Sequence, residues 1–308
     1  MESKRNRALR LFKLHNNILS CPVCGNSLKA DDDYTLSCIL GHSFDISKKG
    51  VVNFAGKGND ILYDDFLFTN RREVIKDGYF APLIDKITKV INENISFSED
   101  RTVNLLDAGC GEGSFLNSVY DLYKESQNNS PTSNDLFLGV DLSKKGINMA
   151  SDHNADIIWL IDDLSKMNIK GSSFDIILNI LSPANYEKFR SILKNDGFVV
   201  KVIPGKEYLK EIRSLYDKHA SSEVSEEKND SLYNNTETKE HTRKEMNVIL
   251  RNKVNYTLKL NSTEFKRFVN MTPMTKNKYI FNDEYDSVDE LKKVYELTID
   301  LEIFVGKL

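Results

Sequence analysis

Short apolar runs alternate with amphipathic segments through the middle of the chain. Apolar runs bounded by turn residues suit buried parallel strands, and apolar positions three and four residues apart suit helices. The predicted strands are Val103–Asp107, Leu136–Asp141, Asp156–Ile161, Phe174–Leu181 and Gly197–Ile203. Helical spacing is found near residues 114–126, 144–152, 184–194 and 205–219. This order predicts an α/β protein whose doubly wound, Rossmann-like sheet carries helices on both faces.

The two ends of the chain follow other patterns. Arg7–Leu19 has a loose helical spacing, and residues 61–92 predict one or two helices that connect two domains. Residues 220–245 are polar and predict a mobile surface insertion. Val254–Leu260 and Leu297–Val305 predict two further strands, with a helix over Val288–Tyr295 between them. We therefore expect three parts, which are residues 1–56, 57–100 and 101–308.

Composition and charge narrow the class of protein. The 308 residues are 40% hydrophobic, but none of their apolar runs reaches the roughly eighteen residues of a membrane helix, and no signal-peptide pattern follows the basic N-terminus. We therefore expect a cytoplasmic protein without a membrane partner. The net charge is −4, yet residues 1–57 hold nine Lys or Arg against five acids, a net of +4. A basic end suits contact with phosphate, although a solvated basic helix would carry the same charge.

Three of the four cysteines lie in one short segment. Cys21 and Cys24 are separated by two residues, Cys38 follows after thirteen more, and His42 comes after a further three. This is the ligand spacing of a tetrahedral zinc ribbon, although three buried thiols and an unrelated histidine are the alternative. Four protein ligands close the coordination shell, so we expect one structural Zn²⁺ that stabilises a segment too small for a core of its own.

Glycines and acids follow the first predicted strand. Gly109, Gly111 and Gly113 allow a tight turn and a close approach of the backbone to a ligand. Dinucleotide sites share such glycines, but Asp107 and Glu112 would repel a pyrophosphate. The same two acids would attract the cationic ammonium and sulfonium of S-adenosylmethionine.

Further acids end the next two predicted strands. Asp141 is placed to bind both ribose hydroxyls, and Asp162 and Asp163 to accept from the adenine amino group. Leu142 and Leu164 would pack on the adenine ring. A helix N-cap is the alternative role for any one of these acids. Together, these positions predict an S-adenosylmethionine site at the carboxyl ends of the strands.

These motifs, taken together over nearly the whole chain, resemble one family, the RlmA-type 23S rRNA (guanine-N1)-methyltransferases. The segments that carry the resemblance are the ribbon Cys21–His42, Lys49–Phe54, Tyr63–Phe66, Arg71–Glu73, Gly78–Leu83, the LDAGCGEG loop at Leu106–Gly113, Asp141–Lys144, Leu181–Tyr186 and Met271–Thr275. The segments Ser182–Asn185 and Lys201–Gly205 are most similar to the Gram-positive branch. Val51 stands where an aromatic residue is common, a departure that would weaken a stacking contact with RNA.

The resemblance implies a class I methyltransferase fold with an N-terminal zinc ribbon. It implies that S-adenosylmethionine donates a methyl group to N1 of a guanosine in the hairpin 35 loop of 23S rRNA, a modification linked to tylosin-type macrolide resistance. A homodimer is implied, in which the zinc modules help to shape a cleft for the RNA hairpin. The side chains expected to clamp the RNA are Arg5, Arg7, Arg10, Arg71 and Arg72. Arg71 and Arg72 are alternatively ion-pair partners of Asp64 and Asp65.

The segment after the fourth predicted strand faces the methyl group in such a fold. Pro183 is a candidate to pack on the guanine face and Asn185 to hydrogen-bond its edge, although Pro183 would also suit the start of a helix. The sequence singles out no general base. A small-molecule methyltransferase and a non-catalytic RNA-binding adaptor with a methyltransferase-like body are the alternative functions. The basic ribbon argues against the first, and the intact acids Asp107, Glu112 and Asp141 argue against the second.

Overall fold

An eight-stranded sheet forms the centre of the protein. The structure, a computed structural model, describes residues 2–56, 65–94, 102–127, 134–153, 156–221, 235–273 and 293–308. Six strands run parallel, in the spatial order β4 (Val51–Asn53), β7 (Ile158–Ile161), β6 (Leu136–Asp141), β5 (Asn104–Ala108), β8 (Phe174–Ile180) and β9 (Leu193–Pro204). Next to β9 lies β11 (Tyr295–Lys307), which pairs antiparallel with both β9 and β10 (Asn247–Leu260).

The chain reverses its direction of winding at β5. It moves from β5 to β6 and β7 on one side, then returns to β8 and β9 on the other. Such a switch point opens a crevice at the carboxyl ends of the strands. The five strands predicted for this part of the sheet are confirmed, and so is the doubly wound α/β class.

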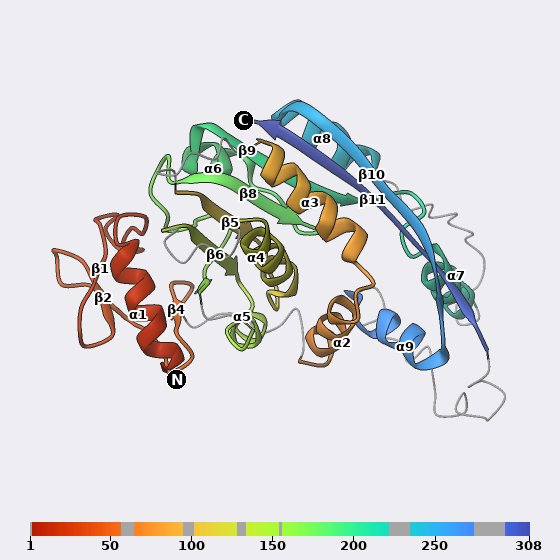
Figure 1. The fold of residues 1–308 in the computed structure, drawn as a ribbon, viewed down its shortest axis with the longest axis horizontal. Coiled ribbons are helices and arrows are strands. Elements are labelled where there is room, and N and C mark those ends of the chain that lie inside the picture. Colours follow the sequence, from red (N-terminus) through yellow and green to blue (C-terminus); the bar gives the residue numbers. More distant parts are fainter. Residues whose placement is uncertain are drawn as a thin grey trace.

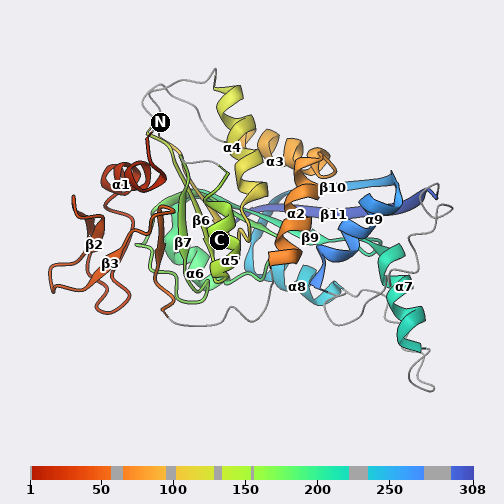
Figure 2. The same cartoon turned by 90° about the horizontal axis from the view of Figure 1, so that it is seen from below.

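Alternating residues of the strands face two separate apolar layers. In β5, Leu105 contributes to one buried cluster and Leu106 to the other, as the period of two in a strand requires. The helices on the first face are α2 (Asp65–Lys76), α3 (Ala81–Asn94), α4 (Ser114–Ser126), α5 (Lys144–Ala150) and α9 (Ser262–Asn270) (Figures 1 and 2). The helix α7 (Lys210–Ser221) contacts β11 and contributes Ile212 to the same cluster. The second face is covered by α1 (Lys4–Leu14), α6 (Tyr186–Ile192) and the N-terminal ribbon, with α8 (Thr236–Glu245) beside α6.

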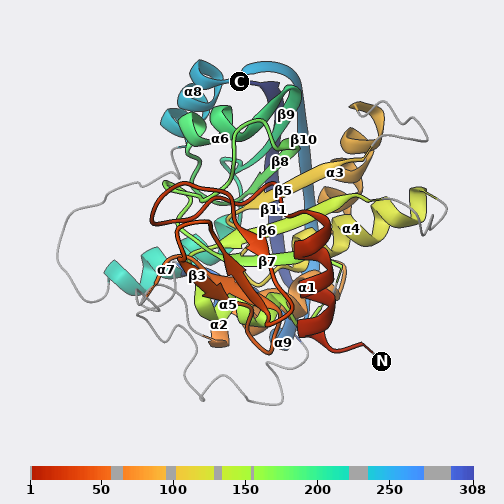
Figure 3. The ribbon, with the colours of Figure 1, turned by 90° about the vertical axis from the view of Figure 1, so that its left-hand side faces the viewer.

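The N-terminal ribbon packs on the sheet. Its three antiparallel strands are β1 (Lys29–Ala30), β2 (Thr35–Ser37) and β3 (Ser43–Asp45), and Figure 3 shows them with α1 in front of the large sheet. Leu28 and Leu36 belong to the same buried cluster as sheet residues. The chain then enters the large sheet through β4, which pairs with β7. Val51 is 4% exposed and opposite Trp159, so its side chain packs in the sheet and is not placed to stack on RNA.

Several sequence-predicted elements need correction. The first helix begins at Lys4, where the Ser3 hydroxyl accepts from the Asn6 N–H, and it ends before Ile18. Residues 220–245 do not form one insertion, because Thr236–Glu245 is the helix α8. The helix predicted over 288–295 falls mostly outside the described residues, and its last residue, Tyr295, begins β11. Within the described ranges, no helix has both the length and the apolar character that a membrane span requires.

Candidate active site and metal centre

A cleft of about 950 Å³ opens at the carboxyl ends of the parallel strands. The loops that follow β5, β6, β7, β8 and β9 form its floor and one wall. Phe68, Arg71 and Ile75 of α2, together with Met271–Pro273 after α9, form the opposite wall. The volume lies at the upper end of the range for small-molecule sites. The cleft therefore has room for a cofactor and part of a second substrate.

The predicted glycine loop lines this cleft, and two of its glycines are required for different reasons. Gly109 has φ +88°, and a Cβ there would lie 1.9 Å from the Ser182 Oγ. Gly113 has φ +80°, and a Cβ there would lie 2.6 Å from the Trp159 ring. Gly109 thus lets two cleft loops approach each other, whereas Gly113 lies behind the cleft and lets α4 pack on the sheet. Gly111 lines the cleft, as the sequence predicts.

Asp141 ties the glycine loop to the end of β6. Its carboxylate accepts from the Gly111 N–H at 2.8 Å and from the Ser143 N–H at 2.8 Å. Burial raises the pKa of Asp141, and these two N–H groups oppose the increase. The carboxylate lines the cleft at the position predicted for ribose hydroxyls.

Asp107 lies beneath the glycine loop rather than on the cleft wall. The side chain is 1% exposed, and its Oδ1 has no hydrogen-bond partner among the described residues. Burial, followed by the nearby carboxylates of Asp141 and Glu112, raises the pKa of Asp107 to about 8. An orphaned buried carboxyl oxygen next to a cleft is what a site for a cationic ligand would leave in the absence of that ligand.

Glu112 lines the cleft but has partners within the protein. Its Oε2 accepts from the Ser114 hydroxyl at 2.5 Å and lies 3.5 Å from His153 Nε2 and 3.6 Å from Arg72 Nε. Arg72 also donates to the Met149 carbonyl at 2.5 Å. Arg72 therefore fastens α2 to the glycine loop and to α5, which differs from the predicted RNA contact and from a pair with Asp65. Asp64 lies outside the described residues.

Only one of the two acids that follow β7 lines the cleft. Asp162 is 2% exposed and points toward Asn168. Its carboxylate accepts a hydrogen bond from the Asn168 backbone N–H at 2.8 Å. Asp163 lines the cleft and accepts from the Ser165 N–H at 2.8 Å. Leu142 and Leu164 also line it, as the predicted adenine pocket requires.

The segment after β8 forms the part of the cleft predicted to hold the base. Pro183 and Asn185 both line the cleft. Asn185 is the N-cap of α6, because its Oδ1 accepts from the Lys188 N–H at 2.9 Å, so Pro183 precedes the helix and does not start it. Beneath this segment, Asn179 donates to the Ala108 carbonyl at 2.7 Å and to the Pro183 carbonyl at 3.1 Å.

Two further cleft residues were not identified from the sequence as site residues. Lys201 of β9 lines the cleft and is 4% exposed. Phe68 of α2 lines the opposite wall. A lysine inside an otherwise apolar run, Phe198–Ile203, was the available sequence signal for the first. Arg71, predicted to contact RNA, also lies on this wall, where it donates to the Met271 carbonyl at 3.3 Å and its charge acts to lower the pKa of Asp141.

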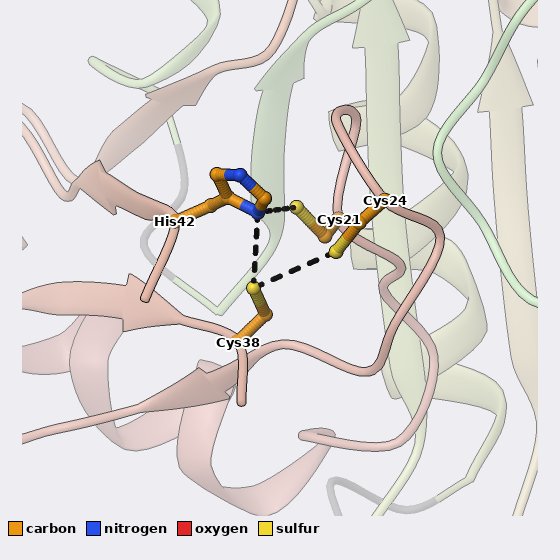
Figure 4. Close-up of side chains that lie close together, drawn as sticks. All are labelled: Cys21, Cys24, Cys38 and His42. Atoms are coloured by element: carbon orange, nitrogen blue, oxygen red, sulfur yellow. Dashed lines mark hydrogen bonds between the residues drawn. The ribbon is translucent and has the colours of Figure 1, made fainter. Parts of the chain in front are cut away.

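The four predicted zinc ligands converge at one point (Figure 4). Their ligand atoms all lie within 4.8 Å of one another; His42 Nδ1 is 3.4 Å from Cys38 Sγ and 3.6 Å from Cys21 Sγ. Hydrogen bonds from the Asn26 backbone and side chain lower the pKa of Cys24 to about 6, which favours the thiolate that binds metal. Three thiol groups and one imidazole form a closed set that fits a tetrahedral structural zinc ion.

The predicted basic side chains of α1 have partners within the chain. Arg5 donates to the Ile46 carbonyl at 2.8 Å and lies over the Tyr34 ring. Arg7 is 3.3 Å from Glu2, and Arg10 is 3.3 Å from Asp156. The pair of Arg10 with Asp156 is solvent-exposed and that of Arg7 with Glu2 partly so, and both are therefore weak and do not prevent contact with a phosphate, whereas the bond from Arg5 to Ile46 is partly buried.

The sheet order, the reversed strand β11 and the glycine–acid cleft together define a class I, Rossmann-like methyltransferase. Residues 19–55 match the family model described as "RlmA, N-terminal", a zinc ribbon. The chain is 32% identical over 296 residues to "Putative 23S rRNA (guanine-N(1)-)-methyltransferase YxjB" of Bacillus subtilis, covering 94% of this chain and 97% of that protein. It is 24% identical to the "23S rRNA (guanine(748)-N(1))-methyltransferase" of Streptomyces fradiae, over 63% of this chain and 66% of the relative.

The chain therefore belongs to the RlmA-type 23S rRNA (guanine-N1)-methyltransferase family, as the sequence motifs predict. Its cofactors are S-adenosylmethionine and one structural Zn²⁺. Among solved structures, the YcgJ protein of Bacillus subtilis aligns with 72% of this chain and 97% of its own at 18% identity, with a TM-score of 0.41.

Proposed function

We propose that this protein transfers the methyl group of S-adenosylmethionine to N1 of a guanosine in the hairpin 35 loop of 23S rRNA. The observation that carries the proposal is similarity to a relative named "Putative 23S rRNA (guanine-N(1)-)-methyltransferase YxjB" over 94% of the chain, which includes both the ribbon and the methyltransferase cleft. The hairpin 35 loop is what the resemblance to the family implies. An rRNA substrate implies a cytoplasmic location. The ribbon and the cleft in one chain suit a large substrate held at two places.

The cofactor would be held by groups already positioned in the cleft. The Gly109–Gly111 backbone provides room, and the Asp141 carboxylate would take the ribose hydroxyls. Asp163, Leu142 and Leu164 would bind the adenine, with Asp162 positioning their loop through Asn168. The negative charge of ionised Asp107 would favour the cofactor's ammonium from below. When bound, S-adenosylmethionine supplies an electrophilic methyl group.

The target base would enter beside Leu181–Asn185. A base in a hairpin loop is already partly unstacked, so extrusion into the cleft costs only about a few kcal/mol. Pro183 would pack on one face of the guanine. The Asn185 Oδ1 is engaged by the helix cap, but its Nδ2 has no partner among the described residues and can donate to guanine O6.

The rest of the RNA would be held by the N-terminal part of the chain. Arg7 and Arg10 of α1 form weak ion pairs with Glu2 and Asp156, which cost little to exchange for a phosphate. Arg5 lies on the same helix and would exchange its bond to the Ile46 carbonyl. A homodimer would place two such ribbons beside one hairpin. Arg72 is better placed to position the glycine loop than to contact RNA.

The experiment that tests the proposal uses labelled S-adenosylmethionine and protein-free 23S rRNA. Methylation at N1 blocks base pairing, so primer extension should stop one nucleotide before a guanosine of hairpin 35. RNA without label would contradict the methyltransferase proposal. A stop at another loop would contradict only the assigned nucleotide. The mass of the protein particle in solution, measured with and without a hairpin RNA, tests whether the protein is a dimer.

A further inference from the structure

Lys201 is a buried amine on the floor of the cleft. Strand pairing places it opposite Asn179 of β8, and its Nζ donates to the Asn179 Oδ1 at 2.5 Å and to the Ser182 carbonyl. Within the described residues, no carboxylate forms an ion pair with it. Ser182 begins the segment that holds the predicted base contacts Pro183 and Asn185, so the amine lies directly behind them.

An ammonium in this position costs free energy. Transfer of a charge from water to the protein interior is unfavourable unless a counter-ion compensates for it. Burial alone lowers the pKa of Lys201 to about 8. With this pKa, roughly a tenth of Lys201 is a neutral amine at pH 7, whereas an exposed lysine is almost fully charged.

The two hydrogen bonds orient the amine. A neutral lysine amine has two N–H donors and one lone pair, and two carbonyl-type acceptors occupy both donors. Its lone pair must then point along the remaining tetrahedral direction. Lys201 lines the cleft, and a base role requires this lone pair to face a ligand there.

The other charged side chains of the cleft are less suited to receive a proton. Glu112 is held by Ser114 and lies next to Arg72 and His153. Asp141 accepts from two backbone N–H groups, and Asp163 from the N–H and hydroxyl of Ser165. The two remaining charged side chains, Arg71 and Arg213, stay protonated.

Building on the proposed function, we propose that the neutral amine of Lys201 is the base that takes the proton from guanine N1. The N1–H electron pair becomes the lone pair that forms the new bond from N1 to the methyl carbon. The bond from that carbon to sulfur breaks, and its electrons stay on sulfur. The products are N1-methylguanosine, S-adenosylhomocysteine and a Lys201 ammonium, which returns its proton to water.

The decisive variants are Lys201→Arg and Lys201→Met. Arginine can donate to the same two acceptors but cannot lose its proton. Lys201→Arg therefore distinguishes a role of Lys201 as a base from a role as a structural cation. Single-turnover methylation of the rRNA should fall by about 10²–10⁴-fold in both, the usual contribution of a general base. Lys194→Arg, an exchange elsewhere in β9, should keep the wild-type rate. Methylation within threefold of wild type by Lys201→Arg would overturn the proposal.

Two measurements are made on the wild-type protein, and a variant serves only to assign the signal in the second. The wild-type single-turnover rate should rise with pH and level off near the Lys201 pKa, about 8. In protein labelled with ¹³C at the lysine ε-carbon, one signal should titrate near the same pH without any cofactor or RNA, and it should be absent from Lys201→Arg. A Lys201 signal that titrates above pH 10, like a surface lysine, would contradict the proposal.

A more acidic substrate separates this proposal from the proposed function. An RNA that carries 8-azaguanine at the target has a more acidic N1 and needs less help from a base. This RNA should restore most of the rate of Lys201→Met. Equal loss on both RNAs would contradict the base role, whereas a wild type inactive on every rRNA would overturn the proposed function itself.

Discussion

Gly109 and Ser182 lie against each other where the loops that follow β5 and β8 meet. A single added carbon on Gly109 would lie 1.9 Å from the Ser182 Oγ and 2.6 Å from its Cβ. The loop predicted to bind cofactor and the loop predicted to hold the base are therefore in contact at this point. A change in one loop must displace the other.

The first prediction concerns Gly109→Ala. The new methyl group would push Ser182 into the cleft or away from Lys201, and φ +88° would add about 1 kcal/mol of backbone strain. We expect S-adenosylmethionine affinity, measured by calorimetry, to fall at least tenfold. Gly78→Ala is the matched control, because Gly78 has φ +82° but nothing within 4 Å of the added carbon. Equal affinities for both variants would contradict the contact.

A second prediction concerns the pH dependence set by Asp107. Its pKa is about 8 in the folded chain and near 3.8 when unfolded, so the folded state holds an extra proton between these values. Asp107 therefore makes its full contribution to the free energy of unfolding below pH 3.8, and this contribution is lost as the pH rises towards 8. Urea unfolding of Asp107→Asn should lack this decline, and above pH 8 the variant should be the more stable protein. A variant whose stability falls in parallel with the wild type would show that Asp107 is ionised.

The same carboxyl group should release its proton when the cofactor binds. A cationic ligand nearby favours the ionised form, so binding at about pH 6.5 should release close to one proton. Calorimetry in buffers with different ionisation enthalpies measures this number directly. Asp107→Asn should release almost none.

The third prediction addresses the role of Arg72. Arg72→Met removes the cation beside Glu112, which is 1% exposed, and an unpaired buried carboxylate typically costs about 3–5 kcal/mol. His153 and Ser114 remain near Glu112, so we expect the lower end of this range. Adding Glu112→Gln should recover part of the loss in chemical denaturation. If Arg72 serves RNA alone, stability will be unchanged and only RNA affinity will fall.

The fourth prediction concerns the metal. Cys24→Ala should lower the zinc content from one ion per chain to none, and strong chelators should lower the melting temperature of the wild type. The destabilisation should reach the large sheet, because Leu28 and Leu36 share a buried cluster with it. Cys110→Ala is the matched control, since Cys110 lies in the glycine loop and should leave the zinc content at one. Loss of zinc in both variants would contradict the assigned ligand set.

The sequence predicted the features that depend on local pattern. Apolar runs located the strands near β5 to β9, and cysteine spacing alone predicted the ligands that converge in the ribbon. The helix α9 was not predicted, although its sequence signal is local. Asn261 and Glu264 form a capping box before the apolar residues Phe265 and Phe268.

Features that depend on distant contacts could not be predicted. The residues that neighbour Asp162 in the sequence do not indicate that Asp162 points toward Asn168 while Asp163 lines the cleft. The partner of Arg72 is Glu112, which lies in another element, so the nearer Asp65 was a reasonable but wrong guess. Lys201 stands in a predicted strand, and its burial against the segment after β8 is visible only when β8 and β9 pair.

The central claim is that this cleft methylates a guanosine at N1 in 23S rRNA. The most direct measurement is mass spectrometry of nucleosides and of ribonuclease fragments from protein-free 23S rRNA treated with S-adenosylmethionine and either the wild type or Asp141→Ala. We predict one N1-methylguanosine per rRNA, located in hairpin 35, with the wild type and almost none with the variant. An rRNA without N1-methylguanosine, or one that is methylated equally by both proteins, would contradict the account.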